Sequence, residues 1–218
     1  MLFGGLQKLS LIDFPGKICA TVFTVGCNFS CAFCHNPELV DPIKIKKQPI
    51  ISEKEFFEFL NSRQGMLEGV CITGGEPTIH KDLPEFIKKI KKLGFSIKLD
   101  TNGSNPEMLK KLIKNNLIDY IAMDIKGPGQ ASKSIDIIKN SGIDYEFRTT
   151  IVPALHKKED IIKIAKEISP AKKYFLQQFR PGKNLDKKFE KEKTYSKKEL
   201  EDFCEAIKSY FDYCGVRD

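Results

Sequence analysis

The sequence of 218 residues has no tryptophan, only three histidines and no long apolar run. Its longest mostly apolar stretch, 18–27, covers about half of the roughly 20 residues that a membrane-spanning helix needs. Residues 1–8 lack a charged segment followed by an apolar one, so no export signal is visible. These absences argue against a membrane protein or a membrane partner, and we expect the protein to be cytoplasmic.

Arginine is scarce as well, with four residues against 32 lysines in a chain of net charge +7. No basic motif is interleaved with aromatic residues, so we interpret the lysines as a solvated surface and expect no direct contact with nucleic acid. A basic face that docks nucleic acid or an acidic partner is the alternative. Hydrophobic residues make up 41% and charged residues 30% of the chain, as in ordinary globular proteins. We expect a single domain over 1–218.

Three of the seven cysteines are grouped at a Cys-x3-Cys-x2-Cys spacing, as Cys27, Cys31 and Cys34. In a reducing compartment such a group indicates a soft metal rather than disulfides. A four-iron cluster bound by three thiolates has one iron without a protein ligand, and that iron can bind a small molecule. A simple electron carrier would need a fourth cysteine, which is missing nearby. Zinc with His35 as fourth ligand is the rival, although His35 directly follows Cys34 and ligation by both is strained.

The other four cysteines are predicted to be structural. Cys19 and Cys71 lie in predicted strands, where a free thiol behaves as a small apolar side chain. A capping box at Ser196 predicts a last helix, and its apolar spacing extends through Cys204 and Phe211 to Cys214. His80 and His156 carry no functional signal.

A β-branched run, a polar loop and a helical pattern alternate along the chain, which predicts an α/β fold with a parallel sheet. The predicted strands are 18–25, 69–73, 95–99, 120–124, 145–151 and 174–179. Six units are two short of a closed eight-fold barrel, so we favour an open, partial (β/α)6 barrel. A doubly wound sheet is the alternative that the pattern leaves open.

Glycines and polar residues follow these strands, at the edge where parallel α/β folds place their chemistry. Gly74 and Gly75 let the backbone approach a ligand closely, although such a pair is more often only a turn. Asp100 and Asp124 could hold a hydroxyl or a hard cation, or merely cap loops. Arginines in two later strand-end segments could anchor a carboxylate or a ribose, against the alternative of ordinary surface charges. These arginines are Arg148 and Arg180.

The chain resembles the radical S-adenosylmethionine (SAM) enzymes. The resemblance is carried by the three-cysteine motif, with Phe33 before its last cysteine, and by Gly-Gly-Glu-Pro at 74–77. Within that superfamily it is similar to the glycyl-radical-enzyme activases, above all to the longer anaerobic ribonucleoside-triphosphate reductase activating proteins. Further segments that carry this similarity are 11–16, 98–104, 120–126, 147–153 and 176–181.

The resemblance implies an oxidoreductase of the radical SAM type. A 4Fe-4S cluster on Cys27, Cys31 and Cys34 would bind the amino and carboxylate groups of SAM and cleave it reductively. The resulting 5′-deoxyadenosyl radical would abstract hydrogen from a glycine of a glycyl radical enzyme, with flavodoxin or ferredoxin as a low-potential electron donor. The alternatives are a pyruvate formate-lyase-type activase, another radical SAM enzyme, an iron–sulfur electron carrier and a zinc-stabilised interaction domain.

The resemblance also implies individual roles. Gly75 would take the methionine amino group, and Asp100, Thr101 and Asp124 would bind a monovalent cation near the SAM carboxylate. Arg180 stands where some relatives have a histidine. No second cysteine group lies between 36 and 55, so the ferredoxin-like insert of certain activases is absent. The predicted cofactor-binding residues are Phe33, Cys34, His35, Gly74, Gly75, Glu76, Asp100, Asn102, Asp124, Ile125, Lys126, Arg148 and Arg180.

Overall fold

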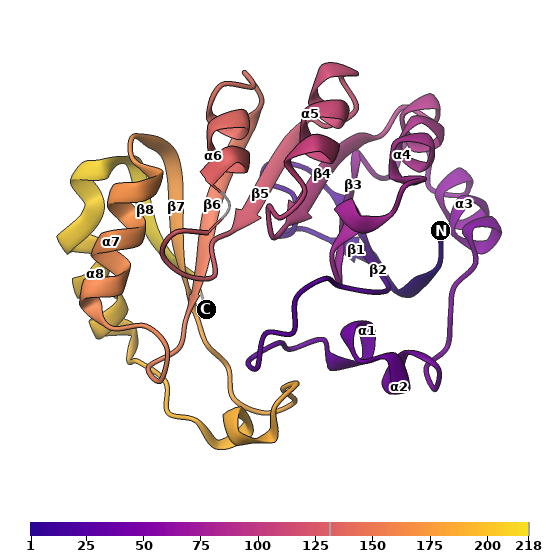
Figure 1. The fold of residues 1–218 in the computed structure, drawn as a ribbon. Coiled ribbons are helices and arrows are strands. Elements are labelled where there is room, and N and C mark those ends of the chain that lie inside the picture. The colour runs from indigo at the N-terminus through magenta and orange to yellow at the C-terminus, as the bar shows by residue number, and fades with distance from the viewer. Residues whose placement is uncertain (131, 218) are drawn as a thin grey trace.

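The fold is a single curved sheet of eight strands in chain order, with helices on its outer side (Figure 1). The computed structural model describes residues 1–130 and 132–217. β1 pairs antiparallel with β2, and every later neighbouring pair is parallel. The strands are β1 Phe3–Ser10, β2 Cys19–Thr24, β3 Gly69–Gly74, β4 Ser96–Thr101, β5 Tyr120–Asp124, β6 Asp144–Ile151, β7 Ala171–Gln178 and β8 Phe211–Arg217.

Helices fill the connections between the successive parallel strands β2 to β8, as the alternating pattern predicts. They are α1 Pro37–Val40, α2 Pro42–Ile45, α3 Glu53–Asn61, α4 Leu83–Lys92, α5 Pro106–Lys114, α6 Ser132–Lys139, α7 Lys158–Ile168 and α8 Lys197–Ile207, with short 3-10 turns η1 Pro77–Ile79, η2 Lys187–Lys191 and η3 Lys208–Tyr210. The predicted capping box at Ser196 is present, and Ser52 with Glu55 forms another at the start of α3, as its Ser-x-x-Glu spacing predicts. None of the helices within 1–130 and 132–217 is long and apolar enough to cross a membrane.

The predicted open, partial barrel is confirmed. The six predicted strands correspond to β2 through β7, and the sheet ends at β1 and β8 rather than closing. A doubly wound sheet would reverse its strand order partway, whereas this order is sequential from first to last. The alternative left open by the sequence is therefore wrong.

The predicted last helix is wrong beyond Ile207. After α8 and η3 the chain turns into β8, so Phe211 and Cys214 lie on a strand that pairs with β7. Aromatic and β-branched residues suit a strand, and the free edge of β7 supplies the backbone partners that a sequence pattern does not reveal. Cys204 on α8 and Cys214 on β8 form a disulfide, where the sequence predicted two apolar side chains of one helix.

Strand β1 has no counterpart among the predicted strands. Gly4 and Gly5 weaken its strand signal, and its register with β2 is interrupted by irregularities. The strand is nevertheless anchored, because the ring of Phe3 is fully buried against Phe56 and Phe86. Tertiary packing, rather than local propensity, makes this segment a strand.

The two faces of the sheet differ in chemistry because side chains alternate along each strand. Outward residues such as Ile72, Leu99 and Phe147 join the apolar core under the helices. The inner face carries charged and polar side chains on β3 to β6, and Phe14 closes it at one end by packing with Cys19, Cys71 and Tyr120. This alternation places polar groups inside the barrel, below the carboxyl ends of the strands.

Candidate active site

The three motif cysteines lie in one pocket at the carboxyl ends of the strands. The loop after β2 carries them, and the carboxyl ends of β3, β4, β5 and β6, together with residues that follow β3, β4 and β5, complete the walls. The lining residues are Cys27, Phe29, Cys31, Phe33, Cys34, His35, Asn36, Val40, Thr73, Gly74, Gly75, Glu76, Asp100, Thr101, Asn102, Asp124, Lys126 and Thr150. Most of the residues that the sequence predicts for the site therefore meet at a single cavity.

The cysteine loop is held from its far side by the segment after β7. The side chain of Asn184, itself buried, donates from Nδ2 to the carbonyl of Phe33 at 3.1 Å. The amides of Leu185 and Asp186 donate to the carbonyls of Cys34 and Ala32 at 3.1 and 2.9 Å. The segment after β7 therefore fixes the backbone of the cysteine loop, although Asn184 and Phe33 are 151 residues apart in the chain. A local sequence pattern does not reveal this contact.

The Gly-Gly pair fits against the start of the cysteine loop. The Gly75 amide donates to the carbonyl of Thr24 and the Glu76 amide to that of Gly26, each at 2.8 Å. A Cβ on Gly75 would lie 1.9 Å from the oxygen of Gly26, and Gly74 has φ +113°. Both positions therefore require glycine: Gly75 for close approach and Gly74 for its backbone conformation.

Glu76 ties two of the loops together. Its buried carboxylate accepts from the Thr101 hydroxyl at 2.7 Å, from the Asn102 amide at 2.6 Å and from Thr78. Asn102 in turn donates from Nδ2 to Oδ1 of Asn28 in the cysteine loop at 3.0 Å. Glu76 and Asn102 line the pocket, and these bonds also set the position of its walls.

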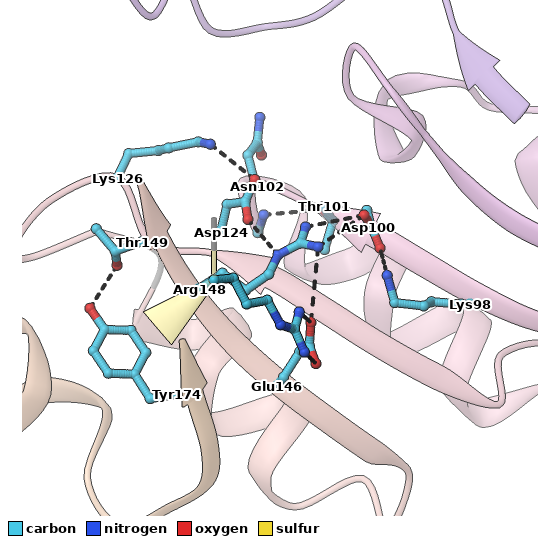
Figure 2. Close-up of polar contacts among 12 residues, drawn as sticks. Lys98, Asp100, Thr101, Asn102, Asp124, Lys126, Glu146, Arg148, Thr149 and Tyr174 are labelled. Carbon is cyan, nitrogen blue, oxygen red and sulfur yellow. Dashed lines mark hydrogen bonds and ion pairs between the residues drawn. The ribbon is translucent and has the colours of Figure 1, made fainter. Parts of the chain in front are cut away.

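Asp100, Asp124 and Lys126 form the floor of the pocket, and Figure 2 shows the polar contacts that join them to Arg148 beneath it. The guanidinium of Arg148 lies between Asp100 and Asp124, and Lys126 pairs with Asp124 at 3.0 Å. Burial by itself would raise the pKa of the Asp124 carboxyl, but Arg148 and Lys126 lower it overall. Burial would likewise raise the pKa of Asp100, but Arg148 and Lys98 lower it overall, so both carboxylates are ionised at neutral pH.

Three predicted cofactor residues lie outside the pocket lining. Ile125 is buried in the core, Arg148 sits beneath the floor, and Arg180 is exposed near His35. Conversely, the sequence missed Phe29, Asn36, Val40, Thr73 and Thr150 as lining residues. Thr73 and Thr150 lie at strand ends, where the two-residue alternation could have found them, whereas Val40 is placed only by the packing of α1.

Most of the pocket residues lie in a segment that matches a known protein family. Residues 21–159 match the family model described as the radical SAM superfamily, which covers more than half of the chain. The chain belongs to the radical SAM superfamily. The matched segment includes the three cysteines, the Gly-Gly-Glu-Pro segment and the charged floor.

Relatives narrow this to the glycyl-radical enzyme activating enzymes. A protein of Methanocaldococcus jannaschii named for that activity is 34% identical over 99% of this chain and 95% of its own length. The pyruvate formate-lyase-activating enzyme of Clostridium pasteurianum is 27% identical over 73% of each chain. The protein is therefore a radical SAM enzyme of the activating family, with a 4Fe-4S cluster and SAM as its cofactors.

A solved structure supports the fold. The Streptococcus suis SuiB structure bound to S-adenosylmethionine superposes with a TM-score of 0.67 at 14% identity. The match covers 91% of this chain and 52% of the SuiB chain, so this radical SAM chain spans about half the length of SuiB. At this identity the likeness shows a shared radical SAM fold.

The thiols of the three motif cysteines are suitable ligands for an iron–sulfur cluster. Burial raises the pKa of the Cys27 and Cys34 thiols, so binding of iron releases their protons. Residues 1–130 and 132–217 contain no group of three His, Cys, Asp or Glu side chains that could hold one metal ion. A four-iron cluster needs no such group, because each thiolate binds a different iron. Three thiols around a shared cavity satisfy that requirement.

His156, for which the sequence predicts no role, connects two loops behind the pocket. Its Nδ1 accepts from the Val152 amide and its Nε2 donates to the carbonyl of Lys126, both at 3.1 Å. Replacing His156 with alanine leaves both buried backbone groups unpaired. We expect a loss of about 2 kcal/mol in unfolding free energy, at roughly 1 kcal/mol per hydrogen bond, measured by urea denaturation of the metal-free protein.

The His156 variant should also change the pH dependence of stability. Burial lowers the pKa of His156, so between its folded and unfolded pKa values the unfolded chain binds the extra proton. Wild-type stability should therefore fall as pH drops below about 6.5, and less steeply in His156→Ala. Burial lowers the pKa of His35 and His80 in the same direction, so the variant keeps part of the slope. An unchanged slope would show that His156 has the same pKa in the folded and unfolded chains, which would contradict this prediction.

Proposed function

We propose that this enzyme installs a glycyl radical on an anaerobic ribonucleoside-triphosphate reductase. The observation that carries the proposal is the pocket in which three cysteines meet the strand-end residues of an open barrel. Similarity to a glycyl-radical enzyme activating enzyme over nearly the full length of both chains supports the reaction class. The choice of a reductase as target rests on the sequence segments that resemble its activating proteins.

The pocket residues bind and orient the cluster and SAM. When bound, the cluster and SAM provide an electron and a carbon-centred radical. Cys27, Cys31 and Cys34 would hold the cluster, and the carbonyl of Gly75, which lines the same pocket, would accept from the methionine ammonium. His35 lies at the exposed rim with its ring 5.8 Å from that of Phe179, where a flat base could rest.

The open side of the barrel suits a protein substrate. β1 and β8 are the end strands of the sheet and are not neighbours in it. The side of the barrel that they leave open would admit a glycine-bearing loop that a closed barrel excludes. Flavodoxin or ferredoxin is the electron donor in this proposal, which places the reaction in the reducing cytoplasm.

The test mixes reconstituted, reduced enzyme with SAM and candidate partners in the absence of oxygen. The partners are an anaerobic reductase with a C-terminal glycyl-radical motif and a pyruvate formate-lyase from the same source. We expect a glycine-centred radical signal on the reductase, together with one 5′-deoxyadenosine per radical. A signal on the lyase alone would select the second candidate, which the 27% identity to a lyase-activating enzyme supports. Cleavage of SAM without a radical on either partner would overturn both.

A further inference from the structure

Arg148 occupies the place that the sequence resemblance assigns to a monovalent cation. The residues expected to hold that cation are Asp100, Thr101 and Asp124. In the structure the Arg148 side chain extends from β6 and lies between the two carboxylates, as Figure 2 shows. The register explains its reach: Asp124 pairs with Arg148, while Asp100 pairs with Ala122, whose small side chain leaves room for a guanidinium.

Every carboxylate oxygen of the pair already has a donor. Asp124 accepts from Arg148 Nε at Oδ1 (2.9 Å) and from Lys126 Nζ at Oδ2 (3.0 Å). Asp100 accepts from both terminal nitrogens of Arg148 at Oδ2 (3.1 Å each) and from Lys98 at Oδ1. The third expected ligand, the Thr101 hydroxyl, also has hydrogen-bond partners already. It donates to Glu76 at 2.7 Å and accepts from the Gly103 amide at 3.1 Å.

The charge balance opposes a further cation. Three carboxylates face four cationic side chains in this cluster, because Glu146 lies 4.0 Å from Arg148 and pairs with Arg217. The Arg148, Asp100 and Asp124 side chains are only 11%, 15% and 26% exposed. Charges this poorly solvated interact strongly, so an added Na⁺ or K⁺ would be repelled by the surplus positive charge. The residues therefore do not fit the expected cation.

We propose that the guanidinium of Arg148 replaces the monovalent cation in this enzyme, as a fixed positive charge under the SAM-binding floor. Arg148 is a positioning residue: it holds Asp124, and through it Lys126, which lines the pocket. SAM binding then needs no Na⁺ or K⁺. The inference rests on membership of the radical SAM superfamily and is independent of which protein accepts the radical.

The test measures SAM affinity of the anaerobic, cluster-loaded enzyme in choline chloride, and again after KCl or NaCl replaces choline at constant chloride. For the wild type we expect less than about a two-fold change. Arg148→Ala removes the Arg148 donors from Oδ2 of Asp100 and Oδ1 of Asp124. For this variant we expect affinity in choline to fall at least roughly ten-fold, as for the loss of a charge-assisted bond. KCl or NaCl should restore a part of it, and binding of Tl⁺, followed by its NMR linewidth, should appear in this variant only.

The matched control is Lys172→Met, which removes an exposed cation paired with Asp144 on the same sheet and should show neither effect. Arg148→Gln serves as the second variant if Arg148→Ala does not fold, with the same expectation of a response to K⁺. A wild-type affinity that rises more than about five-fold with K⁺, or Tl⁺ binding to the wild type, would overturn the proposal. A folded Arg148 variant that responds no differently to K⁺ and choline would also overturn it.

Discussion

Replacing Cys31 with alanine is expected to abolish reductive cleavage of SAM while the protein remains folded. Loss of a residue that hydrogen-bonds to a metal ligand typically lowers metal affinity or activity about 10- to 100-fold, so removal of a ligand itself should lower them more. Stability should change little, since Cys31 is partly exposed in a loop outside the main core. Cluster binding is measured by iron and sulfide content, SAM cleavage by release of 5′-deoxyadenosine, and folding by far-ultraviolet circular dichroism.

Cys19→Ala is the matched control for Cys31→Ala. Cys19 is fully buried on β2 and packs with Phe14 at the opposite end of the barrel from the cluster loop. We expect a loss of about 1 kcal/mol in unfolding free energy, as for the removal of other small buried groups, with the iron content and SAM cleavage of the wild type. If Cys31→Ala unfolds while Cys19→Ala does not, the motif is a structural metal site rather than a catalytic one.

Gly75→Ala is expected to damage both the fold and the SAM site. The new Cβ would lie 1.9 Å from the carbonyl oxygen of Gly26, and that neighbour is backbone that cannot rotate away. Overpacking typically costs 1–3 kcal/mol, and we expect about 3 kcal/mol here because the Glu76–Gly26 hydrogen bond must also move. Thermal and urea unfolding measure the loss, and equilibrium binding of SAM should weaken in parallel.

Gly127→Ala provides the control for that substitution. Gly127 follows β5 in a nearby loop, a Cβ there meets nothing within 4 Å, and its backbone is not left-handed. Its unfolding free energy should stay within about 0.5 kcal/mol of the wild type or rise slightly. Equal stability of the two variants would contradict the close approach of Gly75 to the cysteine loop.

Local sequence was sufficient for the repeating part of the fold. The strands β2 to β7 and the capping boxes at Ser52 and Ser196 follow from alternation and end signals that act over a few residues. The sequence did not predict the two edge strands, because the contacts that stabilise them come from distant parts of the chain. Phe3 on β1 is held by Phe56 and Phe86, and β8 is defined by the free edge of β7.

The candidate active site also has features that follow from local sequence and features that depend on tertiary contacts. The sequence by itself determined the cysteine spacing, the glycines and the polar strand ends, because parallel strands bring their carboxyl ends to one edge. It could not decide which polar groups bind one another. Only the tertiary structure placed Arg148 between Asp100 and Asp124, fixed the cysteine loop with Asn184, and gave His156 its two backbone partners. Those contacts depend on which side chains of neighbouring strands and distant loops come within hydrogen-bond reach, and spacing along one chain does not encode that distance.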